Sequence, residues 1–252
     1  MKNIKLIQGD CLEVMKDIPD GSIDMILTDP PFNVTACKWE WDIMTRIDEF
    51  WEQWKRIIKE NGVIVIFGIE PFSSKLRVSN LGIYKYDFIW EKEMGTGFAR
   101  SNKQPLRKHE NISVFYSKQP FYNSVGKKLK KPYRHTLPIY KSKSDNVSSE
   151  NLNEDEKRIY KEYHYSKKNS ILRFARDPLK LHPTQKPVKL LEYLIKTYTL
   201  KNETILDCFM GSGSTIIAAL NTDRKAIGIE LDKDYFKIVQ KRIKDHLGLF
   251  AD

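Results

Sequence analysis

Two short segments carry side chains whose types and spacing suit chemistry on a bound ligand. The first is Asp29-Pro30-Pro31-Phe32, directly after an apolar run at residues 23–28. Two consecutive prolines stiffen the backbone and remove two N–H donors, which leaves the carbonyl groups free to accept hydrogen bonds. Such a turn can direct the Asp29 carboxylate and the Pro30 carbonyl at one amino group, with the Phe32 ring beside it. It therefore favours a site for an amino group on a planar base, although Asp-Pro also begins ordinary loops.

The second segment is TILDCFMGSGSTIIAA, residues 204–219, which predicts a buried strand, a glycine-rich turn and a helix. This order is typical of nucleotide-type ligand sites. Gly211 and Gly213 permit a close approach of the backbone and unusual torsion angles. Ser214 and Thr215 are candidates to cap the helix that follows. A purely structural tight turn would have the same glycines, so the turn alone does not decide the ligand.

Two carboxylates near this turn narrow the choice of ligand. Glu230, about 17 residues beyond Gly213, ends the next expected strand, where a carboxylate can accept both hydroxyls of a ribose. Asp207, just before the turn, would repel a dinucleotide pyrophosphate but attract an ammonium or sulfonium group. The third glycine of the dinucleotide pattern is also replaced, by Ile216. These features favour S-adenosylmethionine over NAD.

The elements that must position these segments alternate along the chain. Apolar runs rich in Ile, Val and Leu predict parallel strands at residues 4–8, 23–28, 63–67, 204–209 and 225–230. Residues 84–90 and 111–116 suit an antiparallel pair at one edge. Apolar residues at helical spacing predict helices over residues 47–58, 188–198 and 232–247, with Asn61-Gly62 as the stop of the first. The alternation predicts an α/β doubly wound sheet.

The positive charge of the chain is concentrated in one segment. The 252 residues carry 43 Lys and Arg against 33 Asp and Glu, a net charge of +10. Residues 118–180 hold 16 of the basic and 7 of the acidic residues, a net of +9, so the remainder is nearly neutral at +1. The segment lacks apolar periodicity and interleaves its cations with tyrosines. It therefore suits an inserted, partly mobile segment that binds nucleic acid, or a solvated loop that is merely basic.

Composition excludes several other classes of protein. Hydrophobic residues make up 40% of the chain, enough for one sizeable core. No apolar run approaches the ~18 residues that span a bilayer, and residues 1–10 lack an apolar signal segment. The three cysteines have no CxxC spacing, so neither a disulfide framework nor a zinc ribbon is indicated. We expect a single-domain cytoplasmic protein without a metal site.

Taken together, these motifs resemble those of the amino-group DNA methyltransferases that use S-adenosylmethionine. DPPF is similar to their catalytic motif, and DCFMGSGST with GIE (residues 228–230) is similar to their cofactor motifs. HPTQKP, residues 182–187, resembles the remaining cofactor segment. The order of the motifs resembles the circularly permuted β group, and the resemblance covers residues 1–118 and 180–248. It implies a mostly parallel seven-stranded sheet of the Rossmann-like methyltransferase type, with residues 118–180 as the target-recognition segment.

The resemblance also implies a role for each candidate residue. Asp29, Pro30, Pro31 and Phe32 would hold the target amine, and Lys127, Lys128, Lys130, Lys131 and Arg134 would contact DNA. The substrate would be double-stranded DNA with the target base flipped out; a homodimer and a cognate restriction enzyme stay open. Asp10 and Cys11 would contact the cofactor's adenine, and Thr184 and Lys186 its methionine end. The full set of expected cofactor ligands is Asp10, Cys11, His182, Thr184, Lys186, Asp207, Phe209, Gly211, Ser212, Gly213, Thr215 and Glu230.

Several alternatives stay open on the sequence alone. Asp29 at the first motif position resembles the adenine-N6 enzymes, whereas cytosine-N4 enzymes more often carry Ser there, so cytosine N4 is the second choice. An inactive cofactor-binding module would keep the turn without the chemistry. His182 suits a helix cap as well as a ligand contact. Methylation at cytosine carbon 5 needs a thiolate in a Pro-Cys turn, and zinc deamination needs HxE and PCxxC; none of these patterns occurs.

Overall fold

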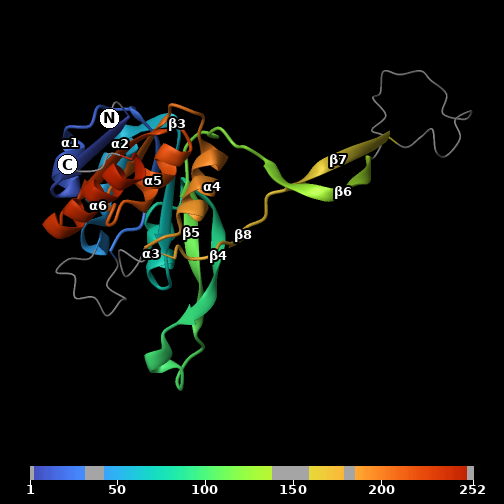
Figure 1. Cartoon of the computed structure of the whole chain (residues 1–252), viewed down its shortest axis with the longest axis horizontal. Helices are drawn as coiled ribbons and strands as arrows, with labels where there is room; N and C mark the ends of the chain where they lie inside the picture. Colours follow the sequence, from blue (N-terminus) through green and yellow to red (C-terminus); the bar gives the residue numbers. More distant parts are fainter. Residues whose placement is uncertain (1–2, 32–42, 138–158, 179–184, 249–252) are drawn as a thin grey trace, which may run out of the picture. The chain divides into compact units, whose positions relative to one another are not determined.

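The computed structural model describes residues 3–31, 43–137, 159–178 and 185–248 (Figure 1). The chain divides into two compact units, one comprising residues 1–123 and 170–252, the other residues 124–169. The expected inserted segment, residues 118–180, therefore begins and ends within the larger unit. None of the helices in the described ranges is long and apolar enough to cross a membrane.

The larger unit is built on one sheet, of which eight strands are described. In spatial order they are β1 (Ile4–Gln8), β10 (Lys225–Glu230), β9 (Thr204–Asp207), β2 (Ile23–Thr28), β3 (Ile58–Gly68), β5 (Arg107–Phe115), β4 (Tyr84–Thr96) and β8 (Ile171–Arg173). The first five run parallel, and β5 is antiparallel to both β3 and β4. The seven strands expected from the sequence are all present, and the three-residue β8 adds an eighth, parallel to β4.

The order of the strands reverses between β9 and β2. Chain segments that follow β9 lead to β10 on one side, whereas those that follow β2 lead to β3 on the other. In an open parallel sheet, such a switch point leaves a crevice outside the carboxyl ends of the two strands, where ligands bind. The fold is therefore the doubly wound α/β type that the sequence predicts, and its crevice lies where Asp29 and Asp207 end their strands.

Helices cover both faces of this sheet (Figure 1). Successive residues of a strand point to opposite faces, so Met25 and Leu27 pack on one side and Ile26 on the other. One face is covered by α4 (Val188–Tyr198), α5 (Ser214–Asn221) and α6 (Lys233–His246). The other face is covered by α1 (Cys11–Lys16), α2 (Ile47–Ile57) and α3 (Phe72–Ser79). Two short 3₁₀ turns, η1 (Ile43–Arg46) and η2 (Phe98–Arg100), complete the unit.

Helix α2 shows how local sequence sets the element boundaries. Its buried stripe includes Trp51 and Trp54, as the helical spacing predicts. The predicted stop at Asn61-Gly62 is wrong, because the helix ends at Ile57 and β3 begins at once. Ile23 pairs with Ile58 and Met25 with Val63, so residues 59–62 form a bulge in β3. The Asn-Gly turn therefore bends the strand instead of ending the helix.

The smaller unit contains a two-stranded antiparallel ribbon. Its strands are β6 (Val125–Leu137) and β7 (Ile159–Lys167), with Lys128 opposite Tyr165 and Leu137 opposite Ile159. The ribbon was not predicted from the sequence, because the segment has no alternation of apolar and polar residues.

Candidate active site

Four carboxylates stand at the carboxyl ends of four neighbouring parallel strands. They are Asp10 after β1, Glu230 at the end of β10, Asp207 at the end of β9 and Asp29 after β2. Strands lie ~4.8 Å apart, so this carboxylate row extends over ~14 Å. The hydroxyl of Thr28 donates to Asp207 Oδ1 at 2.8 Å. The segments around Asp29 and Asp207, 178 residues apart in the sequence, therefore lie side by side at the switch point.

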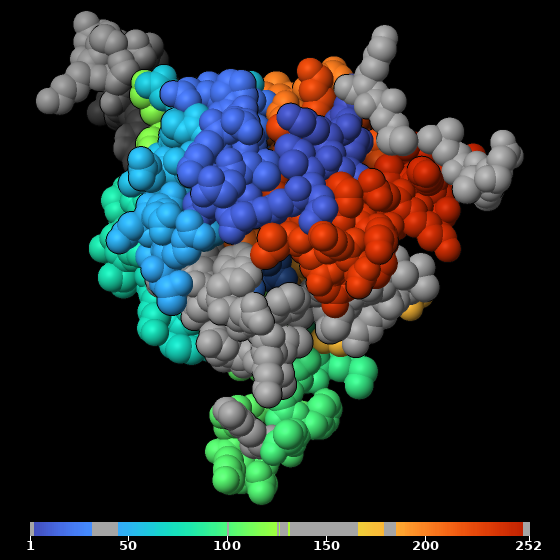
Figure 2. Space-filling model, turned by 90° about the vertical axis from the view of Figure 1, so that its left-hand side faces the viewer, coloured from blue at the N-terminus to red at the C-terminus, as the bar shows by residue number. Residues whose placement is uncertain are grey.

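The carboxylate row contains residues from near both ends of the chain. Figure 2 shows the N-terminal segment in blue next to the C-terminal segment in red, as the parallel pairing of β1 with β10 requires. The N–H of Gly9 also donates to the Glu230 carbonyl at 3.0 Å. This contact brings Gly9, which follows the first strand, close to the glycine-rich turn that comes about 200 residues later in the sequence.

Asp29 has one oxygen bound and one oxygen open. Its Oδ2 accepts from the ammonium of Lys186, whereas its Oδ1 is buried and has no partner among the described residues. Burial raises the pKa of Asp29, and the Lys186 cation opposes that rise. Pro30 is buried and Pro31 half-buried, which fixes the turn. Phe32 lies outside the described residues. Oδ1 is therefore a buried acceptor that is left free for a ligand.

Asp207 is the most deeply buried carboxylate of the row, with 4% of its surface exposed. Burial raises its pKa to about 6, although hydrogen bonds from Thr215, Thr28 and the N–H of Phe209 counteract the rise. The Phe209 N–H donates to Asp207 Oδ1 at 3.1 Å. The ring of Phe209 packs against Phe50 of α2, with 5.6 Å between the ring centroids. Asp207 is thus held by hydrogen bonds from the end of β2 and from the turn that follows β9.

The glycine-rich turn has the unusual torsions that the sequence predicts. Gly211 and Gly213 have φ angles of 51° and 78°. The N–H of Gly211 donates to Glu230 Oε2 at 2.9 Å, which ties the turn to the carboxylate expected to bind ribose. A Cβ at Gly213 would lie 2.0 Å from Val239 of α6, so this position also needs glycine for packing. Burial raises the pKa of Glu230, although backbone N–H groups of Asp232 and Gly211 oppose the rise.

The expected capping of α5 by Ser214 and Thr215 is wrong. Gly213 is the N-cap residue, and no side chain caps the helix. Thr215 instead bonds Asp207, because its hydroxyl points back towards the strand end. Arg242 of α6, which sequence reasoning missed, donates to the carbonyl of Ser212 at 2.9 Å and to the hydroxyl of Ser214 at 3.0 Å. Its only signal in the sequence is a cation on a helix expected to pack near the turn.

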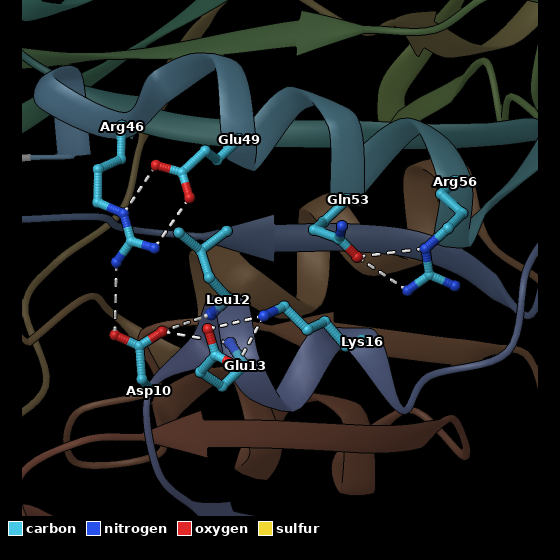
Figure 3. A network of polar contacts seen from close by, with 8 residues as sticks. All are labelled: Asp10, Leu12, Glu13, Lys16, Arg46, Glu49, Gln53 and Arg56. Carbon is cyan, nitrogen blue, oxygen red and sulfur yellow. Dashed lines mark hydrogen bonds and ion pairs between the residues drawn. The ribbon is translucent and has the colours of Figure 1, made fainter.

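Asp10 caps the first helix (Figure 3). Its Oδ1 accepts from the N–H groups of Leu12 at 2.8 Å and Glu13 at 3.3 Å. Its Oδ2 faces Arg46 at 3.9 Å, and Arg46 in turn binds Glu49. Because Oδ1 caps the helix, Oδ2 is left at the rim of the carboxylate row, where it remains partly exposed.

The thiols show no sign of nucleophilic activation. Cys11 and Cys208 are buried, and burial raises both pKa values well above the ordinary range. Trp54 Nε1 donates to the Cys208 sulfur at 3.4 Å, so this thiol is part of the core. Cys37 lies outside the described residues. For the two described cysteines, carbon-5 cytosine chemistry through a thiolate therefore has no support.

Lys186 has two carboxylate partners within the protein. The resemblance implies that it contacts the methionine end of the cofactor; in the structure its ammonium binds Asp29 and lies 3.4 Å from Glu110 Oε2. Sequence reasoning missed Glu110, which this contact brings close to the Asp29 turn. The sequence signal was a charged pair, His109-Glu110, at the start of a strand expected to be buried. His182 and Thr184 lie outside the described residues.

The expected DNA contacts lie on β6. Lys131 is exposed. The backbone of β6 is described at Lys127, Lys128, Lys130 and Arg134, but their side chains lie outside the described part of the structure. The structure thus places all five residues on one strand of the ribbon without defining what they contact.

Comparison with known proteins identifies the family. Residues 23–241 match the model of a DNA methylase family, the N6/N4 methylases. The type II methyltransferase M.HpaI of Haemophilus parainfluenzae is 27% identical, and the match covers 98% of this chain and 76% of that protein. The chain belongs to this family of S-adenosylmethionine-dependent amino-group DNA methyltransferases.

Solved structures agree with this assignment. The M1.HpyAVI complex with S-adenosylmethionine superimposes with a TM-score of 0.61 at 26% identity, over 95% of this chain and 99% of that one. The cytosine-N4-specific PvuII methyltransferase shares the fold, with a TM-score of 0.69 at 17% identity over 98% and 92% of the two chains. The protein is therefore a DNA methyltransferase that uses S-adenosylmethionine.

The chemistry of the carboxylate row fits this cofactor. S-adenosylmethionine presents donors and positive charge along its length: an adenine amino group, two ribose hydroxyls, an ammonium and a sulfonium. The row presents acceptors along a similar length, Asp10, Glu230 and Asp207 in that order. The buried, unpartnered Asp29 Oδ1 comes next, beyond the switch point.

Proposed function

We propose that the protein transfers a methyl group to the exocyclic N6 of adenine in DNA. The observation that carries the proposal is the divided role of the Asp29 carboxylate. One oxygen is held by Lys186, and the other is buried and has no hydrogen-bond partner among the described residues. A fixed acceptor in a dry site is what a weakly nucleophilic amine requires, because such an acceptor costs no reorganisation when the reaction occurs.

The residues of the turn would activate the amine by orientation. The lone pair of an adenine amino group is delocalised into the ring, which makes the nitrogen a poor nucleophile. Hydrogen bonds from its N–H groups to Asp29 Oδ1 and to the Pro30 carbonyl would favour a pyramidal nitrogen, while the Phe32 ring stacks on the base. S-adenosylmethionine, when bound, supplies an electrophilic methyl group. The protein then contributes alignment of the two reactants and no covalent intermediate.

The substrate would be double-stranded DNA with the target base flipped out, since the amine is paired within the duplex. The cations of β6 would hold phosphates, and tyrosines among them could lie along sugars or bases. Relatives named as type II methyltransferases support a role in site-specific modification beside a restriction enzyme. A homodimer would follow the same analogy.

The choice of adenine rests on Asp29. The cytosine-N4 alternative keeps the same chemistry, and the fold of an enzyme with that specificity is similar to this one. A carboxylate at this position, as opposed to a serine, favours adenine by the family resemblance.

The test is transfer of labelled methyl from S-adenosylmethionine to duplex DNA, followed by nucleoside analysis. We expect N6-methyladenine. Recovery of N4-methylcytosine alone would overturn the choice of base and leave the enzyme class intact. Absence of incorporation into DNA of any sequence would favour the inactive cofactor-binding module, provided that calorimetry still detects cofactor binding. Sequencing DNA from cells that express the protein would then give the recognition site.

A further inference from the structure

A chain of four alternating charges runs away from the catalytic turn. Asp29 binds Lys186; Lys186 lies 3.4 Å from Glu110 Oε2; and Lys92 of β4 binds Glu110 Oε1 at 3.0 Å. The side chains are well shielded from water, with exposed fractions of 21% for Asp29, 10% for Lys186, 18% for Glu110 and 3% for Lys92. The four residues come from four different parts of the larger unit, so the fold itself brings them together.

Removal of any one member of this charge chain would leave a shielded ion without its partner, at a cost in free energy. A buried ion without a counter-ion is strongly destabilised, so each inner member needs both neighbours. Lys186 also lies over the ring of Phe67, with its Nζ 5.2 Å from the centroid. The ammonium therefore has one aromatic and two carboxylate partners and is fixed in place. A fixed cation, in turn, fixes the carboxylate that it binds.

We propose that Lys186 and Glu110 form a positioning pair for Asp29, which holds Oδ2 so that Oδ1 stays open towards the substrate amine. Glu110 acts through Lys186: it keeps the ammonium between the two carboxylates and prevents it from reaching further into the crevice. The proposal rests on the proposed role of Asp29 as the acceptor for the target amine. It applies equally to an adenine or a cytosine target.

The charges around Asp29 give the positioning pair a signature in pH. Lys186 and Lys92 favour the ionised form of Asp29, whereas Glu110 and Asp207 face it with like charge. Transfer requires ionised Asp29, because a protonated oxygen cannot accept in the same way. The rate at saturating cofactor should therefore fall as the pH drops through the pKa of Asp29. Removal of the Lys186 charge raises that pKa, and removal of the Glu110 charge lowers it.

The experiment measures total labelled methyl incorporated into DNA between pH 5 and 9, at saturating S-adenosylmethionine, for Lys186→Met and Glu110→Gln. For Lys186→Met we expect the acid limb of kcat to move up by about one pH unit or more and the plateau to fall ~10–100-fold. For Glu110→Gln we expect the limb to move down, with a plateau decrease of ~10-fold and little change in KM for the cofactor. Lys186→Arg should return the limb towards that of the wild type.

Glu91→Gln is the matched control, because Glu91 precedes Lys92 in the same strand but pairs with the exposed Arg173. It should leave both limb and plateau unchanged. Limbs that stay fixed, or that move in the same direction in both variants, would overturn the positioning pair. If Lys186→Met fails to fold, the downward shift in Glu110→Gln still decides the question. An Asp29→Ala variant with the kcat of wild type would instead refute the proposed role of Asp29 as acceptor, which is a separate outcome.

Discussion

The two compact units of the chain carry their charges in opposite ways. In the larger unit, most charges of the site are shielded from water and meet a specific partner, as in the contacts of Asp29 with Lys186 and of Lys92 with Glu110. In the smaller unit, residues 124–169 hold 12 Lys and Arg against 6 Asp and Glu, and Lys131 is exposed. Buried pairs act over a few ångströms and respond little to salt, whereas exposed cations act over a Debye length and are screened by salt.

Under the proposed function, this difference separates two tasks of the enzyme. Alignment of a methyl donor with an amine needs fixed geometry, which the paired charges of the larger unit provide. Capture of a polyanion needs only positive charge near a phosphate backbone. The net charge of +10 is therefore a poor description of the catalytic unit, because it arises mostly from residues 118–180. If the two tasks are as separate as the charges indicate, a change in one unit should leave the task of the other intact.

The largest effect is expected from Asp29→Ala. Removal of a preorganised acceptor should lower kcat ~10²–10³-fold, because the amine is no longer oriented. Affinity for S-adenosylmethionine should fall only modestly, because Asp207 remains, and affinity for DNA should stay near that of wild type, because the cations of β6 are unchanged. Methyl incorporation, calorimetry and a DNA-binding titration measure the three quantities. A large decrease in DNA affinity would show that the two tasks are not separate.

The second prediction concerns the ribbon. Replacing Lys127, Lys128, Lys130 and Lys131 by Gln should weaken DNA binding and flatten its dependence on salt, by ~0.9 in slope for each phosphate that is no longer neutralised. Cofactor affinity should not change. The matched control replaces four exposed lysines of the larger unit: Lys75, Lys201, Lys237 and Lys241. An unchanged slope in the ribbon variant, or an equal change in the control, would move the phosphate contacts elsewhere.

The third prediction is a pH effect on stability. The pKa of Asp207 is raised from 3.8 to about 6 by burial, so the folded state binds a proton that the unfolded state has released between these values. Its contribution to stability therefore falls as the pH rises from about 4 to 6, and a cost of ~2–3 kcal/mol remains above that range. Asp207→Asn should stabilise the protein at pH 8 more than at pH 5, while cofactor binding weakens.

Denaturant unfolding of both proteins at the two pH values measures this effect. The asparagine keeps an oxygen that can accept from Thr28 and from the Phe209 N–H, so the comparison isolates the charge. An equal difference at pH 5 and pH 8 would mean that Asp207 has an ordinary pKa and that the interior of the site is wetter than its burial indicates.

The smallest effect is expected at the rim of the carboxylate row. Asp10→Ala removes the cap of α1 and should cost about 1 kcal/mol in unfolding free energy, whereas Asp10→Asn keeps the cap and should cost little. If Asp10 also accepts from the adenine amino group, the alanine variant should bind the cofactor ~10-fold more weakly. Thermal unfolding and calorimetry separate the two effects. Equal stability of both variants would contradict the capping role.

The sequence predicted most of the fold because most of the signal is local. The strands β1, β2 and β10 begin and end where their apolar runs do. The glycine turn was predicted because positive φ angles need glycine. The ribbon of β6 and β7 was missed because its strands carry no alternation. The stop of α2 was misplaced because an Asn-Gly pair serves a bulge as well as a turn.

The site was predicted in part, for a physical reason. Asp29, Asp207 and Glu230 follow buried strands, so the parallel sheet brings them to one edge. The partners of Lys186 were not predictable, since Glu110 lies on an antiparallel strand whose first residues reach that edge only in the folded sheet. Thr28 and Arg242 were missed because a hydroxyl or a cation near a turn has no distinctive pattern. Site residues next to a predicted strand end could be inferred from the sequence, but ion pairs between elements far apart in the sequence could not.

The carboxylate row has a consequence for turnover as well as for binding. Under the proposed assignment, its acceptors surround a ligand whose sulfur is positive before the reaction and neutral after it. The sulfonium's share of the Coulomb attraction to Asp207 and Asp29 is therefore lost on transfer, although the ammonium's share remains, and the same carboxylates hold the spent ligand less tightly than the fresh one. The same row that attracts the methyl donor thus has a lower affinity for the product, which favours product release in each catalytic cycle.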